Sequence, residues 1–433
     1  MKKLQVIYDG WGERWPLGTL ADTGSAILFE YSPQAIARGL QLSPMHQPLP
    51  RAGAAAVSFK GEAYSYGLPG FIADALPDGW GMLLMDRALR KLGRNPREVS
   101  VLERLAIVGE RAMGALSFEP SEEDILPAEK LQLKELAKEI ITLQADENSG
   151  EGKADKQLRH LMQLGGSPQG ARPKVLVDFN ARTGQLSSGM PLAGSATPWL
   201  IKFPAESEHR EVCAIEELYA RVARQGGMDM PRSRFFDLGT KHSAFGVERF
   251  DRKVNVLEGG GVMQDKQVIR VPIMSMSAYL QADYRLPSLD YETVLLATLR
   301  LTGDQREVIK AFERCIFNVI MHNRDDHSRN FAFRMNEQGL WNLSPAFDLT
   351  YSFGPGGEHS TSVAGHGKNI TRAQLMQVAK TGGISSKIAQ RCIDDAMAAA
   401  KGMNRLVRDL PIRRNTLADL IKSTAARMAQ LYE

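Results

Sequence analysis

Residues 322–330 read HNRDDHSRN and follow directly on the apolar run CIFNVIM. Four charged side chains, two histidines and two asparagines stand in these nine positions. Such groups cannot enter a core together without partners, because a buried polar or charged group that lacks one is costly. The chain must therefore leave its core near Met321 and form a polar loop. The spacing within the loop indicates what the loop is for.

Asp325 and Asn330 are five positions apart, giving D-x-x-x-x-N with Arg324 in front. Kinase loops use this spacing to place a base beside the substrate hydroxyl and an amide oxygen on Mg²⁺. Two short strands, NFAFRM and LWNLS, are expected next, joined by the turn NEQG and leading to Asp348. Such a hairpin returns this second carboxylate to the loop. Asn330 and Asp348 would then form the metal-binding pair.

Groups suited to nucleotide phosphates precede the loop in kinase order. Lys202 lies in the apolar strand LIKFP, where an ammonium is costly unless it meets a phosphate or a carboxylate such as that of Glu216. The stretch GGSPQGARPK offers backbone N–H groups and two cations, Arg172 and Lys174. VERFD at 247–251 is expected on the last apolar strand of this region, beside an adenine.

Each feature also has a plainer interpretation. A D-x-x-x-x-N match can arise by chance, and a glycine-rich turn can be only a turn. Lys202 could snorkel at a sheet edge, and Asp348 could cap a helix. The order of all the pieces within one region favours the kinase interpretation.

The remaining loop residues allow alternatives of their own. His322 and His327 could be metal ligands, but hydrogen bonds to the loop backbone are favoured. Only Asp325 has the right offset to Asn330, so Asp326 is expected to point outward or to hold the loop.

The apolar patterns along the chain predict an α+β protein with several parts. Short alternating runs up to residue 60 indicate a β-rich unit, and the stretch after about Ser275 is helical apart from the loop and its hairpin. We predict an N-terminal β-rich and helical module over 1–118, an acidic helix and linker over 119–155, an α/β part over 156–272 and an all-helical catalytic domain over 273–433.

Composition is that of a globular protein, with 43% hydrophobic and 24% charged residues among 433. No apolar window approaches the roughly 20 residues that span a bilayer, and the start MKKLQVIYDGWGERW lacks the apolar core of a signal peptide. The three cysteines are far apart, which is typical of a reducing compartment. We therefore expect a cytoplasmic protein without a membrane partner. The segment from His366 onward carries twelve Lys/Arg against five Asp/Glu, which suits nucleic acid, an acidic partner or simply solvated helix faces.

The sequence resembles the HipA toxin kinases of bacterial toxin–antitoxin modules, which are serine/threonine kinases distantly similar to phosphatidylinositol kinases. The resemblance covers nearly the whole chain. It rests on the succession GLPGFIADALPDGWGMLLMDRALR, LGGSPQGARPKVLV, WLIKFP, GVERFDR, NVIMHNRDDHSRNFAF and LSPAFDLTYSF.

The resemblance implies a HipA-like bilobal kinase fold, ATP and Mg²⁺ as cofactors, and specific residue roles. Asp325 matches the catalytic base, Asn330 and Asp348 the metal-binding pair, and Lys202 the lysine on the ATP phosphates. Ser167 matches the serine whose autophosphorylation switches the kinase off. The nucleotide-binding residues are further expected to include Gln169, Gly170, Ala171, Arg172, Pro173 and Lys174 over the phosphates, Glu248, Arg249 and Phe250 on the adenine side, and His327.

Two departures from the family pattern stand in this sequence. Arg329 takes the place of a lysine found in many members, which keeps the charge, and the loop SPQGARPK has prolines of its own.

The resemblance also implies partners and a biological role. Members phosphorylate an aminoacyl-tRNA synthetase, typically the glutamyl enzyme, and thereby cause growth arrest and persistence. A dimeric helix-turn-helix antitoxin, HipB, neutralises them, and the pair binds operator DNA as a corepressor. Two alternatives stay open: a non-catalytic corepressor with a kinase-like fold, and a small-molecule or lipid kinase.

Overall fold

The structure is a computed structural model that describes residues 1–51, 53, 57–121, 129–145, 158, 160–162, 164–165, 168–188, 195–256 and 266–432. The chain forms two compact units, each of which combines two separate stretches of sequence. The first unit comprises Met1–Arg210 and Phe236–Met274, and the second comprises Glu211–Phe235 and Ser275–Glu433.

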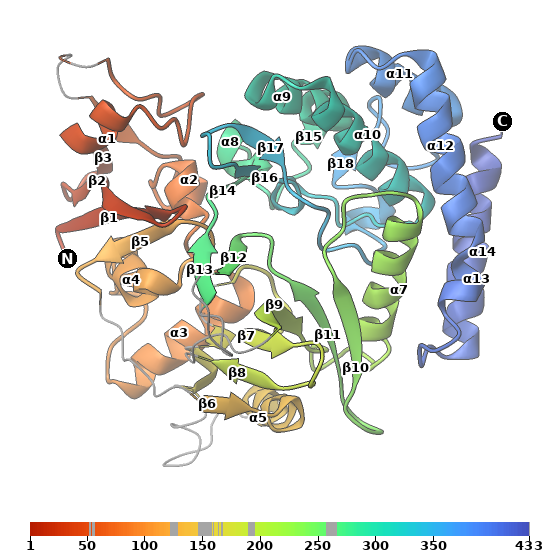
Figure 1. Cartoon of the computed structure of the whole chain (residues 1–433), viewed down its shortest axis with the longest axis horizontal. Helices are drawn as coiled ribbons and strands as arrows, with labels where there is room; N and C mark the ends of the chain where they lie inside the picture. The colour runs from red at the N-terminus through yellow and green to blue at the C-terminus, as the bar shows by residue number, and fades with distance from the viewer. Residues whose placement is uncertain are drawn as a thin grey trace. The chain divides into compact units, whose positions relative to one another are not determined.

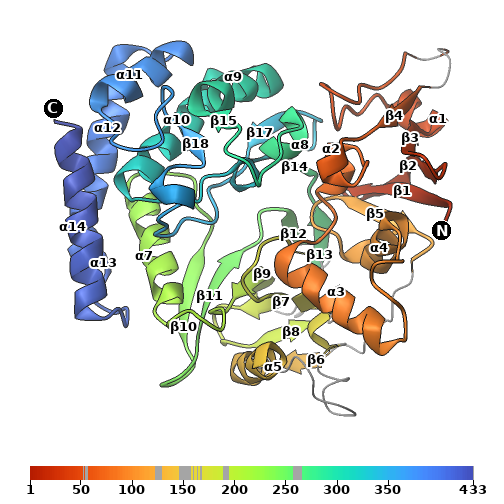
Figure 2. The same cartoon turned by 180° about the vertical axis from the view of Figure 1, so that it is seen from behind.

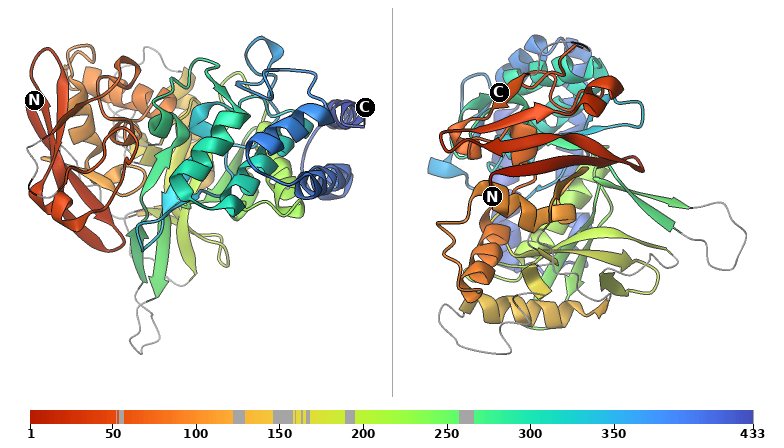
Figure 3. Two further views of the ribbon diagram at one scale, coloured as in Figure 1. Left: turned by 90° about the horizontal axis from the view of Figure 1, so that it is seen from above. Right: turned by 90° about the vertical axis from the view of Figure 1, so that its left-hand side faces the viewer.

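The first unit begins with an antiparallel sheet of order β4-β3-β2-β1-β5. Strand β1 alternates exposed and buried residues along its first half, so that Leu4 and Val6 enter the core while Lys3 and Gln5 do not. The red strands form one layer in Figure 3. The elements of this part are β1 Lys3–Gly10, β2 Glu13–Asp22, β3 Ile27–Tyr31, α1 Pro33–Arg38, β4 Ser58–Lys60, η1 Ala63–Ser65, α2 Gly70–Ala73, α3 Gly79–Lys91, α4 Val101–Val108, η2 Gly109–Arg111 and β5 Leu116–Glu119.

A second sheet in the first unit has the order β10-β11-β9-β7-β8-β6. Val175 and Phe179 of β7 and Ile201 of β9 share one hydrophobic core with Leu136 and Ile140 of α5. Figures 1 and 2 show α5 along the side of the sheet that carries β6 and β8. The elements of this part are β6 Glu129–Leu131, α5 Leu133–Ala145, β7 Lys174–Asn180, β8 Leu186–Ser188, β9 Ala196–Lys202, β10 Ser233–Asp237, β11 Ser243–Glu248, β12 Arg252–Val256, β13 Lys266–Arg270 and β14 Ile273–Ser275.

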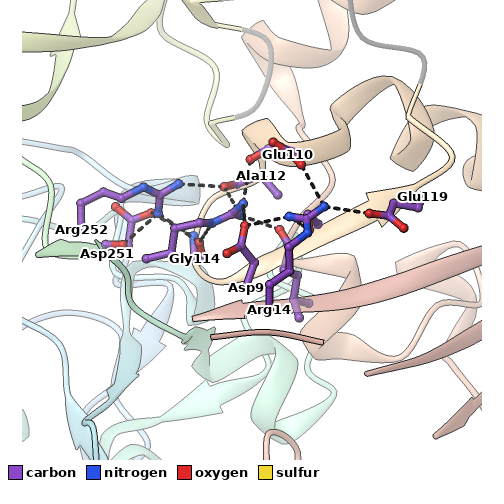
Figure 4. Close-up of polar contacts among 11 residues, drawn as sticks. Asp9, Arg14, Glu110, Ala112, Gly114, Glu119, Asp251 and Arg252 are labelled. Carbon is purple, nitrogen blue, oxygen red and sulfur yellow. Dashed lines mark hydrogen bonds and ion pairs between the residues drawn. The ribbon is translucent and has the colours of Figure 1, made fainter. Parts of the chain in front are cut away.

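A network of charged side chains joins the base of the β12–β13 hairpin to the first sheet (Figure 4). Arg252 donates to Asp251 at 2.7 Å and to the carbonyl of Gly114 at 3.0 Å. Arg270 donates to the same carbonyl at 2.9 Å and to Asp9 on β1 at 3.1 Å. Residues far apart in the sequence are therefore held together by groups that are mostly withdrawn from water.

The second unit is mainly helical. Asp290 and Asp304 cap the N-termini of α9 and α10, and each accepts a hydrogen bond from a backbone N–H of the first turn. Helix α12 packs against α10 and α11, and α11 to α14 make up the blue part of Figures 1 and 2. The elements are α7 Val212–Gln225, α8 Met276–Leu280, β15 Leu289–Asp290, α9 Tyr291–Thr302, α10 Gln305–Ile320, η3 Ser328–Asn330, β16 Ala332–Met335, β17 Trp341–Leu343, η4 Pro355–Gly357, β18 Thr361–Ser362, α11 Arg372–Thr381, α12 Ser386–Lys401, α13 Met403–Leu406 and α14 Arg414–Gln430.

The structure divides the chain differently from the sequence prediction. The range expected as an acidic helix and linker contains α5 and β6, which are parts of the second sheet and its core. Helix α7, expected inside the α/β part, belongs to the helical unit. The polar stretch 147–155, expected as the linker itself, lies outside the described residues.

Candidate active site

The polar loop begins where α10 ends. The amide of Met321 donates to the carbonyl of Phe317, and His322 then adopts a positive φ of 55° that turns the chain away from the helix axis. Tyr219 of α7 donates from its hydroxyl to the Met321 carbonyl at 2.6 Å. The start of the loop is thus fixed by a buried tyrosine.

The two consecutive aspartates of the loop have opposite environments. The Asp325 side chain is 55% exposed, and its Oδ1 lies 3.9 Å from His327 Nε2. The Asp326 side chain is fully buried and accepts hydrogen bonds from Tyr291 and His359. Asp326 therefore holds the loop, which confirms one of the two alternatives predicted from the sequence. The other alternative, that Asp326 points outward, is wrong.

The offset between Asp325 and Asn330 corresponds to a direct contact. Asn330 Nδ2 donates to the Asp325 backbone carbonyl at 2.5 Å. This bond uses the amide nitrogen of Asn330 and leaves the amide oxygen as the group of that side chain suited to a cation.

His327 hydrogen-bonds the loop backbone, which confirms the favoured interpretation for that residue, whereas His322 hydrogen-bonds the backbone of the segment that returns to the loop. His327 Nδ1 accepts from the amide of Arg329 at 3.2 Å, and His322 Nδ1 lies 3.0 Å from the carbonyl of Ser352. Burial, followed by the charge of Arg324, lowers the pKa of His322 below its ordinary value. The role of His327 in nucleotide binding stays a prediction.

The expected hairpin follows the loop, with β16 and β17 paired antiparallel from Met335↔Trp341 to Phe333↔Leu343. Asp348 comes five residues after β17, with a positive φ of 54° and in no helix, so the helix-cap alternative is wrong. The chain beyond it returns to the loop, because Ser352 bridges Asn323 and its amide donates to the His322 carbonyl at 3.0 Å.

Oxygen donors on the loop and on its neighbouring segment suit the metal that kinases use. Asn330 supplies an amide oxygen and Asp348 a carboxylate, and Mg²⁺ binds such groups in small numbers together with phosphate oxygens and water. Within the described part of the chain, no group of three or more His, Cys, Asp or Glu side chains is arranged to hold a metal ion.

In the first unit, Lys202 is the last residue of β9 and is 7% exposed. Strand β9 lies between β7 and β11, so Lys202 does not snorkel at a sheet edge. Its Nζ is 5.9 Å from the centroid of the Phe245 ring, and Lys174 is its partner in the register with β7. Glu216 is buried in α7 of the other unit, and its pairing with Lys202 stays a prediction.

The glycine-rich loop is bound to the segment before α3. Gln169 Nε2 donates to the carbonyls of Asp74 and Leu76 at 3.1 and 3.2 Å. The Gly170 amide donates to the Asp78 carboxylate, and the Gly170 carbonyl accepts from the Trp80 amide at 3.1 Å. Gly170 has a φ of 101°, which favours glycine.

The loop's cations have protein partners in this conformation. Arg172 pairs with Glu208 at 2.7 Å, and Lys174, which is 4% exposed, donates to the Gln169 carbonyl. Contact of either cation with phosphates stays a prediction that requires these bonds to be exchanged. Ser167, the expected autophosphorylation site, lies outside the described residues.

The expected adenine-side residues lie at the end of β11. Glu248 is the last residue of that strand and is paired with Trp199, and the Arg249 amide donates to the Pro198 carbonyl at 2.9 Å. Arg249 and Phe250 therefore lie beyond the strand on which the sequence placed them. The Arg249 side chain pairs with Asp251 at 2.7 Å.

Sequence analysis missed the residues that support the loop from a distance. Tyr291, His359 and Thr361 all bond Asp326, yet they lie 35, 33 and 35 positions away, and no spacing rule connects them. The polar cluster HST at 359–361 was the available signal.

Two family models together match most of the chain. The HipA N-terminal domain matches residues 7–119, and the HipA-like C-terminal domain matches residues 166–403. The chain belongs to the HipA family. The predicted family and the predicted α+β fold class are thus confirmed.

Individual relatives of this HipA-family chain are distant. HipA in the complex of the Shewanella oneidensis MR-1 toxin–antitoxin proteins HipA and HipB with operator DNA matches with a TM-score of 0.67 and 17% identity, over 99% of this chain and 96% of that one. At this identity the likeness shows the HipA fold alone. The Helicobacter pylori proinflammatory kinase CtkA matches with a TM-score of 0.35 and 10% identity, over 59% of this chain and 93% of that one.

A Sinorhizobium fredii protein named "Putative kinase Y4dM" is 26% identical over 302 residues, 66% of this chain. The match spans only 63% of that relative's length. In the described part of the HipA-family chain, no helix is both long and apolar enough to cross a membrane.

Proposed function

We propose that this HipA-family chain is an ATP-dependent protein serine/threonine kinase. The observation that carries the proposal is the geometry of the loop after α10, where an exposed Asp325 carboxylate stands on a backbone tied directly to Asn330. Family membership and the kinase name of the Sinorhizobium relative support the same activity.

Each residue of the second unit has a proposed task. When bound, ATP supplies the γ-phosphoryl group and Mg²⁺ neutralises its developing charge. Asp325 accepts the proton of the target serine or threonine hydroxyl as that oxygen attacks phosphorus. Asn330 and Asp348 would hold the metal through their oxygens.

In the first unit, the proposed task of Lys202 is to contact the nucleotide phosphates, because a nearly buried ammonium at a strand end can neutralise a phosphate without losing much water. The loop from Gln169 to Lys174 would cover the phosphates with its N–H groups. Glu248 to Phe250 and His327 complete the proposed nucleotide contacts.

The proposed target is a component of translation, an aminoacyl-tRNA synthetase such as the glutamyl enzyme, whose phosphorylation would arrest growth in the cytoplasm. A HipB-like antitoxin dimer and operator DNA are the proposed partners, supported by the complex in which the Shewanella HipA was solved. Autophosphorylation of Ser167 is the proposed means of switching the kinase off.

Phosphate transfer from γ-labelled ATP with Mg²⁺ tests the activity, with glutamyl-tRNA synthetase and a cell lysate as targets and phosphosites mapped by mass spectrometry. Asp325→Asn should abolish transfer and keep nucleotide binding, whereas Asp419→Asn, at an exposed aspartate of α14, should transfer normally. Equal transfer by wild type and Asp325→Asn would overturn the mechanism. No transfer by the wild type would favour the non-catalytic corepressor.

A further inference from the structure

Asp326 is the most completely satisfied carboxylate group of the loop, and the proposed chemistry does not use it. Its Oδ2 accepts from the Tyr291 hydroxyl at 2.8 Å and lies 2.8 Å from His359 Nδ1. Its Oδ1 accepts from the backbone amides of Ser360 and Thr361 at 2.8 and 3.3 Å. A fully buried carboxylate is tolerated only with such partners.

The segment 359–361 holds the backbone on both sides of Asp325. The Arg324 carbonyl accepts from the Ser360 hydroxyl at 3.1 Å. The Asp326 carbonyl accepts from the Thr361 hydroxyl at 2.5 Å. The peptide before Asp325 and the peptide after Asp326 are therefore both fixed, while the Asp325 carboxylate stays exposed.

This segment is itself attached to regular structure. Thr361 pairs with Leu289 in the parallel β15–β18 bridge, immediately before α9. Tyr291, in the first turn of α9, accepts a hydrogen bond from Asn318 of α10 at 2.9 Å. Both helices therefore support the contacts that hold Asp326, and rigid elements position reacting groups better than free loops do.

We infer that Asp326, with Thr361, is a positioning residue that sets where the Asp325 carboxylate stands. The inference rests on the proposed kinase function and adds to it which contacts orient the base. The Asp326 carboxylate anchors the loop, and Thr361 fixes the peptide that follows Asp326. A displacement of about 1 Å at a reacting group can slow catalysis about a hundredfold.

The matched pair Thr361→Val and Thr361→Ser separates positioning from packing. Valine keeps the shape of threonine but removes the hydroxyl that bonds the Asp326 carbonyl, whereas serine keeps the hydroxyl and removes a methyl group. If the hydrogen bond matters, Thr361→Val lowers kcat about ten- to a hundredfold with the KM for ATP nearly unchanged, and Thr361→Ser stays close to wild type. Asp326→Asn, which replaces an acceptor by a donor facing Tyr291 and His359, should behave like Thr361→Val.

The rates are measured as phosphate incorporation from γ-labelled ATP into lysate proteins at ATP concentrations below and above KM. Amide hydrogen exchange over residues 322–331 is followed in the same samples and should speed up in Thr361→Val and Asp326→Asn only. Equal losses of kcat in Thr361→Val and Thr361→Ser would show packing and overturn the inference, as would unchanged kcat in Thr361→Val. If the wild-type protein transfers no phosphate, the proposed function is overturned. The exchange data still test the inference in that case, because unchanged exchange in Thr361→Val and Asp326→Asn would show that the loop does not depend on these contacts.

Discussion

The backbone amide of Gly114 donates a hydrogen bond of 2.9 Å to the carboxylate of Asp251, although 137 positions separate the two residues. Gly114 lies in the region that matches the HipA N-terminal domain, and Asp251 lies in the region that matches the C-terminal domain. This hydrogen bond therefore joins the two matched regions through a buried charged group.

Asp251→Asn should destabilise the protein by about 3–5 kcal/mol, because it leaves Arg249 and Arg252 without their buried counter-charge. The free energy of unfolding in urea at neutral pH measures the loss. As a control, Asp237→Asn removes a 61% exposed partner of Arg210 and should cost less than about 1 kcal/mol. Equal effects of the two substitutions would contradict the buried network.

The same carboxylate should make the protein sensitive to acid. Burial raises the pKa of Asp251, but Arg249 and Arg252 outweigh it and hold the pKa far below its ordinary value. A depressed folded-state pKa contributes stability that is present above the unfolded value and lost as the pH falls through the folded one. The melting temperature of the wild type should therefore fall as the pH is lowered into the acid range. The fall should be smaller in Asp251→Asn.

Asp178 should have the opposite pH dependence. Burial raises its pKa to about 6, with Arg249 opposing the rise. Its contribution to stability is full below the unfolded value, near 3.8, and is lost as the pH rises through about 6. Asp178→Asn should raise the melting temperature relative to wild type at about pH 8 and change it little at about pH 4. Glu30→Gln, at an exposed strand position, is the matched control for the loss of one carboxylate.

Gly79→Ala should disturb the glycine-rich loop. A Cβ on Gly79 would lie 2.7 Å from the Gly170 carbonyl oxygen and 2.8 Å from Ala171 Cα. We expect ATP affinity to fall about tenfold, or about 1.4 kcal/mol, when a non-hydrolysable ATP analogue with Mg²⁺ is titrated calorimetrically. Gly93→Ala, just beyond the same helix, also has a positive φ but meets no atom within 4 Å, so it should bind normally. Equal ATP affinities of the two variants would show that the contact between the start of α3 and the glycine-rich loop does not affect nucleotide binding.

Gly354→Ala should displace the loop that carries Asp325. Its Cβ would lie 2.0 Å from the Glu358 carbonyl oxygen and 2.6 Å from the Arg324 Cβ. Gly356→Ala, two residues on, shares the positive φ and has no atom within 4 Å. Both should lose about 1–3 kcal/mol of stability through backbone strain, but only Gly354→Ala should also lower the rate of phosphate transfer. Matching rates in the two variants would disprove the displacement.

Local pattern was enough to predict much of the fold. The alternation in β1 and the hairpin of β16 and β17 follow from side chains close in the sequence. Helix α5 was also expected, because it is amphipathic, but its partner was not. Its apolar face meets a sheet assembled from strands over 129–248, and periodicity does not identify a distant partner.

In the polar loop, too, the features close in the sequence were predictable and the contacts with distant residues were not. The D-x-x-x-x-N spacing singled out Asp325 and Asn330 as a pair, and the structure joins them by a hydrogen bond across five positions. The supports of Asp326 come from α9 and from residues 359–361, and single-sequence spacing cannot connect them. The convergence of Lys202 with the loop stays a prediction.

Helix α7 lies in the unit completed only by residues 275–433, and its Tyr219 bonds a carbonyl 102 positions later. At about 5–20 residues per second, the ribosome needs roughly 5–20 s to make that interval. During that time the nascent helix presents apolar side chains whose eventual neighbours have not been translated, which makes α7 a natural client segment for chaperones that act during synthesis.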